Sequence, residues 1–175
     1  MLERIWSGWR SSYVTAAPVR NGDEPTEPGS VFTRLLRSGA PDSETHIVHR
    51  GDTCFVVVNL FPYTPGHLLV VPYREVADLD GLTEQETADL WATVTDAVRV
   101  VRSVYAPDGL NVGLNLGRPA GGSGPDHLHI LVVPRWTGDS NFMSAISNTQ
   151  TLPEAIVDTA AKLRAGWAAA TPDGQ

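Results

Sequence analysis

Cysteine is almost absent from this 175-residue chain, in which Cys54 is the only one. An intrachain disulfide and a cysteine-based metal cluster are therefore both excluded. Basic residues are also scarce: 13 Lys and Arg stand against 20 Asp and Glu, which gives a formal net charge of −7. This balance argues against a general nucleic-acid-binding surface, although a few local donors can still hold a small phosphorylated ligand.

Long apolar runs are missing as well. No stretch approaches the ~18 apolar residues needed to span a bilayer, and residues 1–30 lack the basic-then-apolar order of a secretory signal. Together with the near absence of cysteine, this pattern favours a reducing compartment. We therefore expect a cytoplasmic protein that does not interact with membranes.

The order of the predicted elements indicates the fold class. The sequence predicts an N-terminal segment, 1–30, with a short helix over residues 2–14 and a loop rich in proline and glycine. Residues 31–175 make up the main domain. Hydrophobic periodicity predicts strands at 46–50, 53–60, 67–72, 110–116 and 127–133, and helices at 31–37, 83–105 and 153–169. Thr83 and Glu86 have the spacing of a capping box, and Gly51-Asp52 suits a hairpin turn. Because strands dominate the middle of the chain around one long inserted helix, with helices at both ends, we predict an α+β fold with a mostly antiparallel sheet.

Two histidines, His127 and His129, lie two positions apart in a run that otherwise has the pattern of a buried strand. Side chains along a strand alternate between its two faces, so these histidines share one face with Leu131. The intervening apolar residues then face the core (Leu128, Ile130 and Val132). Two imidazoles on one face predict a site, of which Leu131 is the unusual member.

A glycine-rich loop over residues 117–124 leads into this pair of histidines. Small side chains let backbone N–H groups approach an anion, as in phosphate-binding loops. An imidazole at such a site can form a covalent phosphoryl or nucleotidyl intermediate near pH 7. A His-x-His pair can also bind zinc, but no further histidine or aspartate has diagnostic spacing for a third ligand. We favour the phosphate site and predict neither a metal nor a cofactor.

Three segments together resemble the histidine-triad family of nucleotide hydrolases and transferases, and the resemblance covers most of the chain. They are the strand 127–135, the segment 59–72 with its Pro-Gly-His strand start, and Asn115-Leu116-Gly117 with the glycines that follow. The Ala-Gly-Gly-Ser loop, the Pro-Arg-Trp end, residues 138–142 and the N-terminal segment are most similar to the actinobacterial branch that phosphorolyses diadenosine tetraphosphate. The resemblance implies a HIT-like fold, a small nucleotide substrate with inorganic phosphate as a candidate acceptor, and a homodimer or higher oligomer.

The resemblance also implies roles for individual residues. His129 is the expected nucleophile at the α-phosphorus, His127 supports it within the phosphate site, and His67 lies beside the pair as an orienting group. Asn59 is expected to hydrogen-bond the ribose, whereas the phosphate site is lined by Asn115, Gly122 and Ser123. The residues themselves leave alternatives open: either asparagine can cap a turn, and His67 can be a satisfied core histidine.

Leu131 stands where the family has its third histidine. A leucine can neither donate a proton nor form a hydrogen bond, and general acid assistance is typically worth ~10²–10⁴-fold in rate. We predict a nucleotidyl transferase or hydrolase that forms a covalent nucleotidyl-histidine, which phosphate or water then resolves. Two alternatives follow from Leu131: a nucleotide-binding protein with little catalysis, or a fold recruited to specialised metabolism with altered chemistry.

Overall fold

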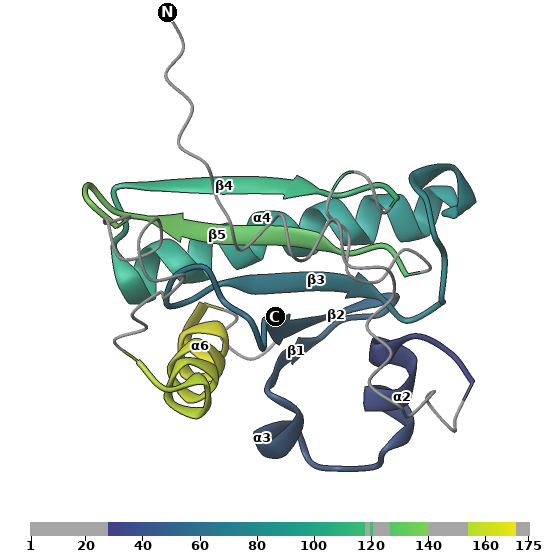
Figure 1. Ribbon diagram of the computed structural model, residues 1–175, viewed down its shortest axis with the longest axis horizontal. Helices are drawn as coiled ribbons and strands as arrows, with labels where there is room; N and C mark the ends of the chain where they lie inside the picture. Colours follow the sequence, from purple (N-terminus) through teal and green to yellow (C-terminus); the bar gives the residue numbers. More distant parts are fainter. Residues whose placement is uncertain (1–27, 118–119, 121–126, 140–153, 171–175) are drawn as a thin grey trace, which may run out of the picture.

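A five-stranded antiparallel sheet forms the centre of the molecule (Figure 1). The computed structural model describes residues 28–117, 120, 127–139 and 154–170. The strand order is β1-β2-β3-β5-β4, and the strands are Ile47–Arg50 (β1), Cys54–Val58 (β2), Leu68–Pro72 (β3), Gly109–Leu114 (β4) and Ile130–Arg135 (β5). The predicted α+β class with an antiparallel sheet is confirmed.

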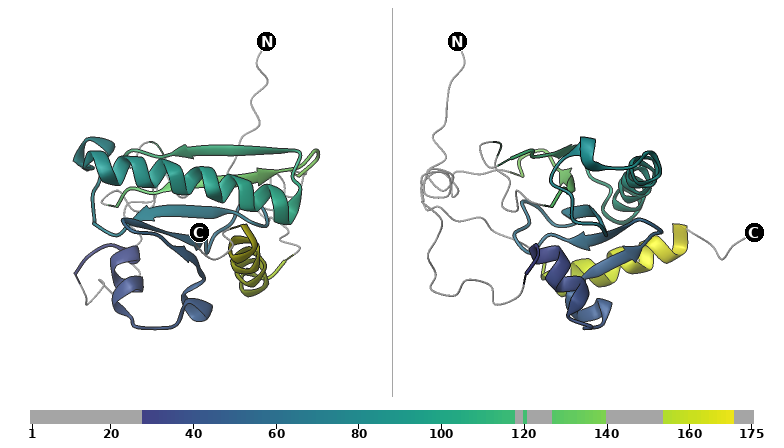
Figure 2. Two further views of the ribbon diagram at one scale, coloured as in Figure 1. Left: turned by 180° about the vertical axis from the view of Figure 1, so that it is seen from behind. Right: turned by 90° about the vertical axis from the view of Figure 1, so that its right-hand side faces the viewer.

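Helices lie on both faces of this sheet. They are α2 (Val31–Arg37), α3 (Asp42–Thr45), α4 (Glu84–Tyr105) and α6 (Ile156–Ala170), with a short 3-10 helix η1 at Leu79–Gly81. The long helix α4 runs across one face, which Figure 2 shows from behind, whereas α2 lies beside the opposite face. Within the described ranges, no helix has the length and apolar character that crossing a membrane requires.

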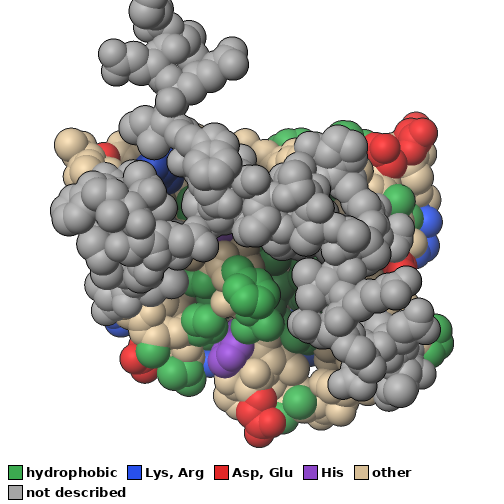
Figure 3. Space-filling view, viewed as in Figure 1, with side chains coloured by type: hydrophobic (Ala, Val, Ile, Leu, Met, Phe, Trp, Pro, Cys, Tyr) green, Lys and Arg blue, Asp and Glu red, His purple; other side chains and the backbone are tan. Residues whose placement is uncertain are grey.

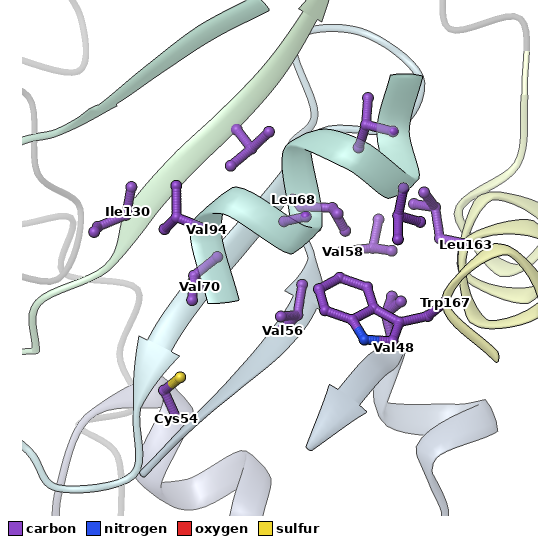
Figure 4. Close-up of a cluster of buried hydrophobic side chains, with 14 of the residues drawn as sticks. Val48, Cys54, Val56, Val58, Leu68, Val70, Val94, Ile130, Leu163 and Trp167 are labelled. Carbon is purple, nitrogen blue, oxygen red and sulfur yellow. The ribbon is translucent and has the colours of Figure 1, made fainter. Parts of the chain in front are cut away.

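The main hydrophobic core lies between the sheet and helices α4 and α6 (Figure 4). Alternate residues of the central strands enter it, and Leu163 and Trp167 of α6 close one end. Helix α6, which the sequence predicts at 153–169, turns one apolar face to this core (Ile156, Ala160, Leu163 and Trp167). The predicted capping box is also present at the start of α4, where Thr83 and Glu86 bond reciprocally.

The opposite face of the sheet carries a smaller apolar cluster beneath α2. Its buried members are Phe32, Ile47, Phe55, Val57, Leu69 and Val71, and Leu131 packs against them. Strand β5 therefore alternates as predicted: Ile130 and Val132 point into the main core, and Leu131 points to the other face. This second face is the one that presents the histidines.

Two local predictions differ from the structure. Strand β5 begins at Ile130 rather than at His127, because the Leu128 amide leaves the sheet and donates to the Val76 carbonyl at 2.6 Å. The turn between β1 and β2 bends at Asp52 and Thr53, where the Gly51 amide donates to the Cys54 carbonyl at 2.9 Å, rather than at Gly51-Asp52. The predicted helix over residues 2–14 lies outside the described residues.

Candidate active site

The histidines and the smaller apolar cluster share one face of the sheet. Figure 3 shows the molecule from this side, with apolar side chains gathered near its centre. The strand register places Leu131 directly between Leu69 of β3 and Gly113 of β4. His129 lies two residues before Leu131 and hence on the same face. Asn59 and His67 meet where β2 ends and β3 begins, since the Asn59 amide donates to the His67 carbonyl at 3.0 Å.

His127 is 1% exposed, and both of its ring nitrogens have partners in the protein. Nε2 lies 2.8 Å from the Pro72 carbonyl oxygen, and because a carbonyl only accepts, Nε2 carries the hydrogen. Burial lowers the pKa of His127, although the Pro72 carbonyl opposes this shift, so the ring is neutral near pH 7. Nδ1 is then an acceptor, and the Ser30 hydroxyl 2.6 Å away donates to it.

His129 is half-buried and is held by the backbone of the same segment. Its Nδ1 lies 3.0 Å from the His127 carbonyl oxygen, so Nδ1 is the donor. In the neutral ring the lone pair therefore resides on Nε2. This is the tautomer that a nucleophilic imidazole requires, and it agrees with the role predicted for His129.

Phe32 of α2 contacts both imidazoles. Its ring centroid lies 5.4 Å from that of His127, at an interplanar angle of 83°, and 5.3 Å from that of His129, at 58°. The contact with His127 is edge-to-face, a favoured packing of aromatic rings, and the contact with His129 is tilted. Phe32 is 9% exposed and thus forms an apolar wall against the histidine pair.

His67 is fully buried at the start of β3. The Tyr63 amide donates to its Nδ1 at 3.2 Å, and the Tyr63 ring lies over it with centroids 4.9 Å apart. The hydrogen of the neutral ring is therefore on Nε2. Burial, and to a smaller extent nearby His129, lowers the pKa of His67 to about 4. His67 is therefore a neutral, packed core histidine, as the alternative interpretation expects. It also lies near the histidine pair, as predicted.

Asn59 uses its side chain on the protein itself. Its Oδ1 accepts from the Phe61 amide at 3.0 Å, which caps the turn that follows β2, and its Nδ2 lies 3.4 Å from the ring nitrogens of His67. The turn-capping alternative is thus present in the structure, and contact with a ribose stays a prediction.

Gly66 explains how the chain enters β3 beside the site. Its φ of +80° lies in the left-handed region, and a Cβ there would stand 2.9 Å from Cε2 of Tyr105. Both the backbone conformation and the close approach therefore require glycine. The Pro-Gly-His spacing seen in the sequence is what sets His67 in its buried place.

We expect His67 to make the stability of the fold sensitive to acid. Its pKa is about 4 in the folded protein against 6.5 for a free histidine, so between these values the unfolded chain binds a proton that the folded chain does not. The free energy of unfolding should thus fall as the pH drops through this window, by about 2–3 kcal/mol between pH 7 and pH 4.5. Urea unfolding at the two pH values measures the loss. It should be smaller by that amount in His67→Asn, and an identical loss in both proteins would contradict this account.

The remaining predicted residues are placed only in part. Asn115 is half-buried directly after β4, at the start of the glycine-rich segment. Gly122 and Ser123 lie outside the described residues. Within the described part of the chain, no group of three or more His, Cys, Asp or Glu side chains could hold a metal ion.

Sequence reasoning missed the contribution of α2. Ser30 and Phe32 contact the histidines from a segment far earlier in the chain. Ser30 and His127 are 97 positions apart. A serine directly before a predicted helix signals an N-cap, and Ser30 does cap α2 by accepting from the Thr33 amide. Nothing in the sequence pattern indicates that the same hydroxyl reaches a histidine.

An antiparallel sheet that carries a backbone-oriented histidine pair on one face defines the class of the protein. The HIT domain matches residues 40–138, and the chain belongs to the HIT domain family. The predicted family is thereby confirmed.

Two curated relatives and one solved structure show what the chain is similar to. The chain is 45% identical over 168 residues to the "AP-4-A phosphorylase" of Mycobacterium tuberculosis strain H37Rv, which covers 95% of this chain and 85% of the relative. It is 35% identical over 95 residues to the asymmetrical bis(5'-nucleosyl)-tetraphosphatase of Schizosaccharomyces pombe, which covers 54% of this chain and 52% of that protein. Among solved structures, a zinc-bound histidine triad family protein from Mycobacterium smegmatis superposes with a TM-score of 0.64 at 26% identity, over 80% of this chain and 94% of its own.

Proposed function

We propose that the protein is a nucleotidyl-transfer enzyme that cleaves a dinucleoside polyphosphate at its α-phosphorus, with His129 as the nucleophile. The orientation of His129 carries the proposal: its Nδ1 donates to the His127 carbonyl at 3.0 Å, which leaves the Nε2 lone pair free for attack. The similarity to an AP-4-A phosphorylase supports the substrate class and inorganic phosphate as the acceptor.

The reaction has two displacements. The His129 Nε2 lone pair attacks the α-phosphorus of diadenosine tetraphosphate, the bond from phosphorus to the bridging oxygen breaks, and ATP leaves as an adenylyl-histidine forms. An oxygen of inorganic phosphate then attacks the same phosphorus, the phosphorus–nitrogen bond breaks, and ADP leaves. Water as the second nucleophile would give AMP instead.

Leu131 restricts the leaving group in this scheme. It packs against the apolar cluster beneath α2, beside Leu69, so the place of the third histidine holds no proton donor. A polyphosphate has a low pKa and departs without being protonated, whereas an amine or alkoxide leaving group does not. A dinucleoside polyphosphate therefore suits a site with leucine at this position.

Product analysis tests the proposal directly. With diadenosine tetraphosphate and excess inorganic phosphate, the protein should yield ADP and ATP in equal amounts, and mass spectrometry with ¹⁸O-labelled phosphate should find the label in ADP alone. AMP in place of ADP would mean that water is the acceptor. Absence of any cleavage, with the nucleotide still bound in calorimetry, would favour the alternative of a binding protein with little catalysis.

The family resemblance also supports a homodimer or a higher oligomer. Strand β4 ends the described sheet, and Val112 on it is 43% exposed. This edge is a surface that a second copy of the chain would cover.

A further inference from the structure

The first residues of α2 hold His127 through a short network of hydrogen bonds. The Ser30 hydroxyl lies 2.6 Å from Nδ1 of His127 and 3.1 Å from Oγ1 of Thr33. The Thr33 hydroxyl donates to Oε2 of Glu75 at 2.5 Å, and the Ser30 amide donates to the same oxygen at 2.9 Å. Ser30 therefore links a carboxylate just after β3, through its amide, to the buried imidazole, through its hydroxyl.

The partners of each group fix the direction of these bonds. Nε2 of His127 donates to the Pro72 carbonyl, so Nδ1 accepts and the Ser30 hydroxyl is its donor. The oxygen of Ser30 in turn accepts from the Thr33 amide at 3.1 Å, as the N-cap of α2. The Thr33 hydroxyl is left to donate to Glu75, whose pKa this hydroxyl and the Ser30 amide hold below its ordinary value.

Resting on the proposed function, we propose that Ser30 is a positioning residue: its hydroxyl holds the orientation of the His127 ring, whose tautomer the Pro72 carbonyl fixes, and thereby the aim of His129. The His127 ring is 1% exposed and both of its nitrogens are engaged within the protein, so we place the influence of His127 on the reaction in its backbone rather than in its ring. Its influence passes through its backbone, whose carbonyl orients the His129 ring. The hydroxyl of Ser30 thus acts two steps away from the nucleophile.

Capping alone does not account for this geometry. An N-cap needs only an oxygen that accepts from the helix, and the Ser30 oxygen does this for the Thr33 amide. The hydroxyl hydrogen has a different partner, because it points to a ring nitrogen of His127, which is 1% exposed. The two roles of Ser30 can therefore be separated by substitution.

Ser30→Gly is the decisive variant, because glycine caps a helix nearly as well as serine but has no hydroxyl. Ser30→Ala removes both the cap and the hydroxyl, whereas Ser30→Thr keeps both. We expect Ser30→Gly and Ser30→Ala to lower kcat for diadenosine tetraphosphate by about 10- to 100-fold, with KM changed by less than about threefold. Ser30→Thr should restore kcat to near that of the unaltered protein.

The imidazole signals provide a readout that is independent of turnover. In two-bond ¹H–¹⁵N spectra the His127 ring, assigned with His127→Asn, should show the Nε2–H tautomer in the unaltered protein and in Ser30→Thr. Ser30→Gly and Ser30→Ala should keep this tautomer, because the Pro72 carbonyl still accepts from Nε2, but their Nδ1 resonance should shift to that of a nitrogen that accepts no hydrogen bond. Thr83→Ala provides the matched control, since it removes the cap of α4 away from the site and should change neither kcat nor these signals.

The outcomes separate this inference from the proposed function. A Ser30→Gly variant with normal kcat and an unchanged Nδ1 resonance of His127 would overturn the role of Ser30, and so would a Ser30→Thr variant as impaired as Ser30→Gly. If the unaltered protein cleaves no dinucleoside polyphosphate, the proposed function fails. The Nδ1 resonance of His127 still decides whether the Ser30 hydroxyl holds its ring.

Discussion

Replacing His129 with alanine is expected to abolish cleavage of every nucleotide that the protein turns over. Of the two histidines, only His129 has a ring nitrogen lone pair that is free to attack, because Pro72 and Ser30 engage both ring nitrogens of His127. Loss of a nucleophile leaves only binding and electrostatic contributions, so the rate should fall by at least ~10³-fold. Initial rates with diadenosine tetraphosphate and phosphate measure the effect.

The mass of the intact protein provides a second test of His129 as the nucleophile. The unaltered protein, quenched in acid-free buffer during turnover without phosphate, should carry one added adenylyl group, and His129→Ala should carry none. His49→Ala is a suitable control, because His49 stacks on Trp167 with ring centroids 4.5 Å apart, in the core helix away from the pair. That variant should keep both the activity and the adduct. Full activity in His129→Ala would refute the mechanism.

The parts of the fold that short-range patterns control could be predicted from the sequence. The period of two in the segment 127–133 placed His129 and Leu131 on one face and Ile130 on the other, because the alternation persists even where the chain has left the sheet. The capping box at Thr83 and the apolar stripe of α6 likewise depend only on neighbours three or four residues away.

Contacts between distant segments could not be predicted in this way. Strand β5 starts three residues late because the Leu128 amide finds the Val76 carbonyl, a partner that no local pattern reveals. The same holds for α2: its predicted bounds agree with the structure, but its place against the histidines depends on tertiary packing of Phe32. The tautomers that define the site follow from these long-range partners, and hence from the structure alone.

Replacing Leu131 with histidine is expected to accelerate the cleavage of nucleotides with poor leaving groups. The side chain of residue 131 lies on the site face two residues beyond His129, where an imidazole can protonate the departing oxygen or nitrogen. Strand β4 leaves room for the imidazole, because Gly113, which pairs with residue 131, has no side chain. No atom lies within 4 Å of where a Cβ on Gly113 would stand. For nucleoside phosphoramidates and alkyl esters the gain should reach ~10²-fold or more, since general acid catalysis matters most for leaving groups of high pKa.

The dependence on the leaving group distinguishes proton donation from a mere change of pocket. In a series of adenosine 5'-phosphate esters, kcat/KM of the unaltered protein should fall steeply as the pKa of the leaving group rises, and Leu131→His should flatten this slope while polyphosphate substrates change little. Leu131→Asn is the matched control, because an amide donates a hydrogen bond but transfers no proton at neutral pH, so its slope should stay steep. An equal gain for all leaving groups would show that Leu131 governs binding instead. A proton donor restored at residue 131 can by itself only assist the departure of a group from the α-phosphorus. If Leu131→His instead loses the native activity while it still binds the nucleotide, the leucine was selected for a different reaction.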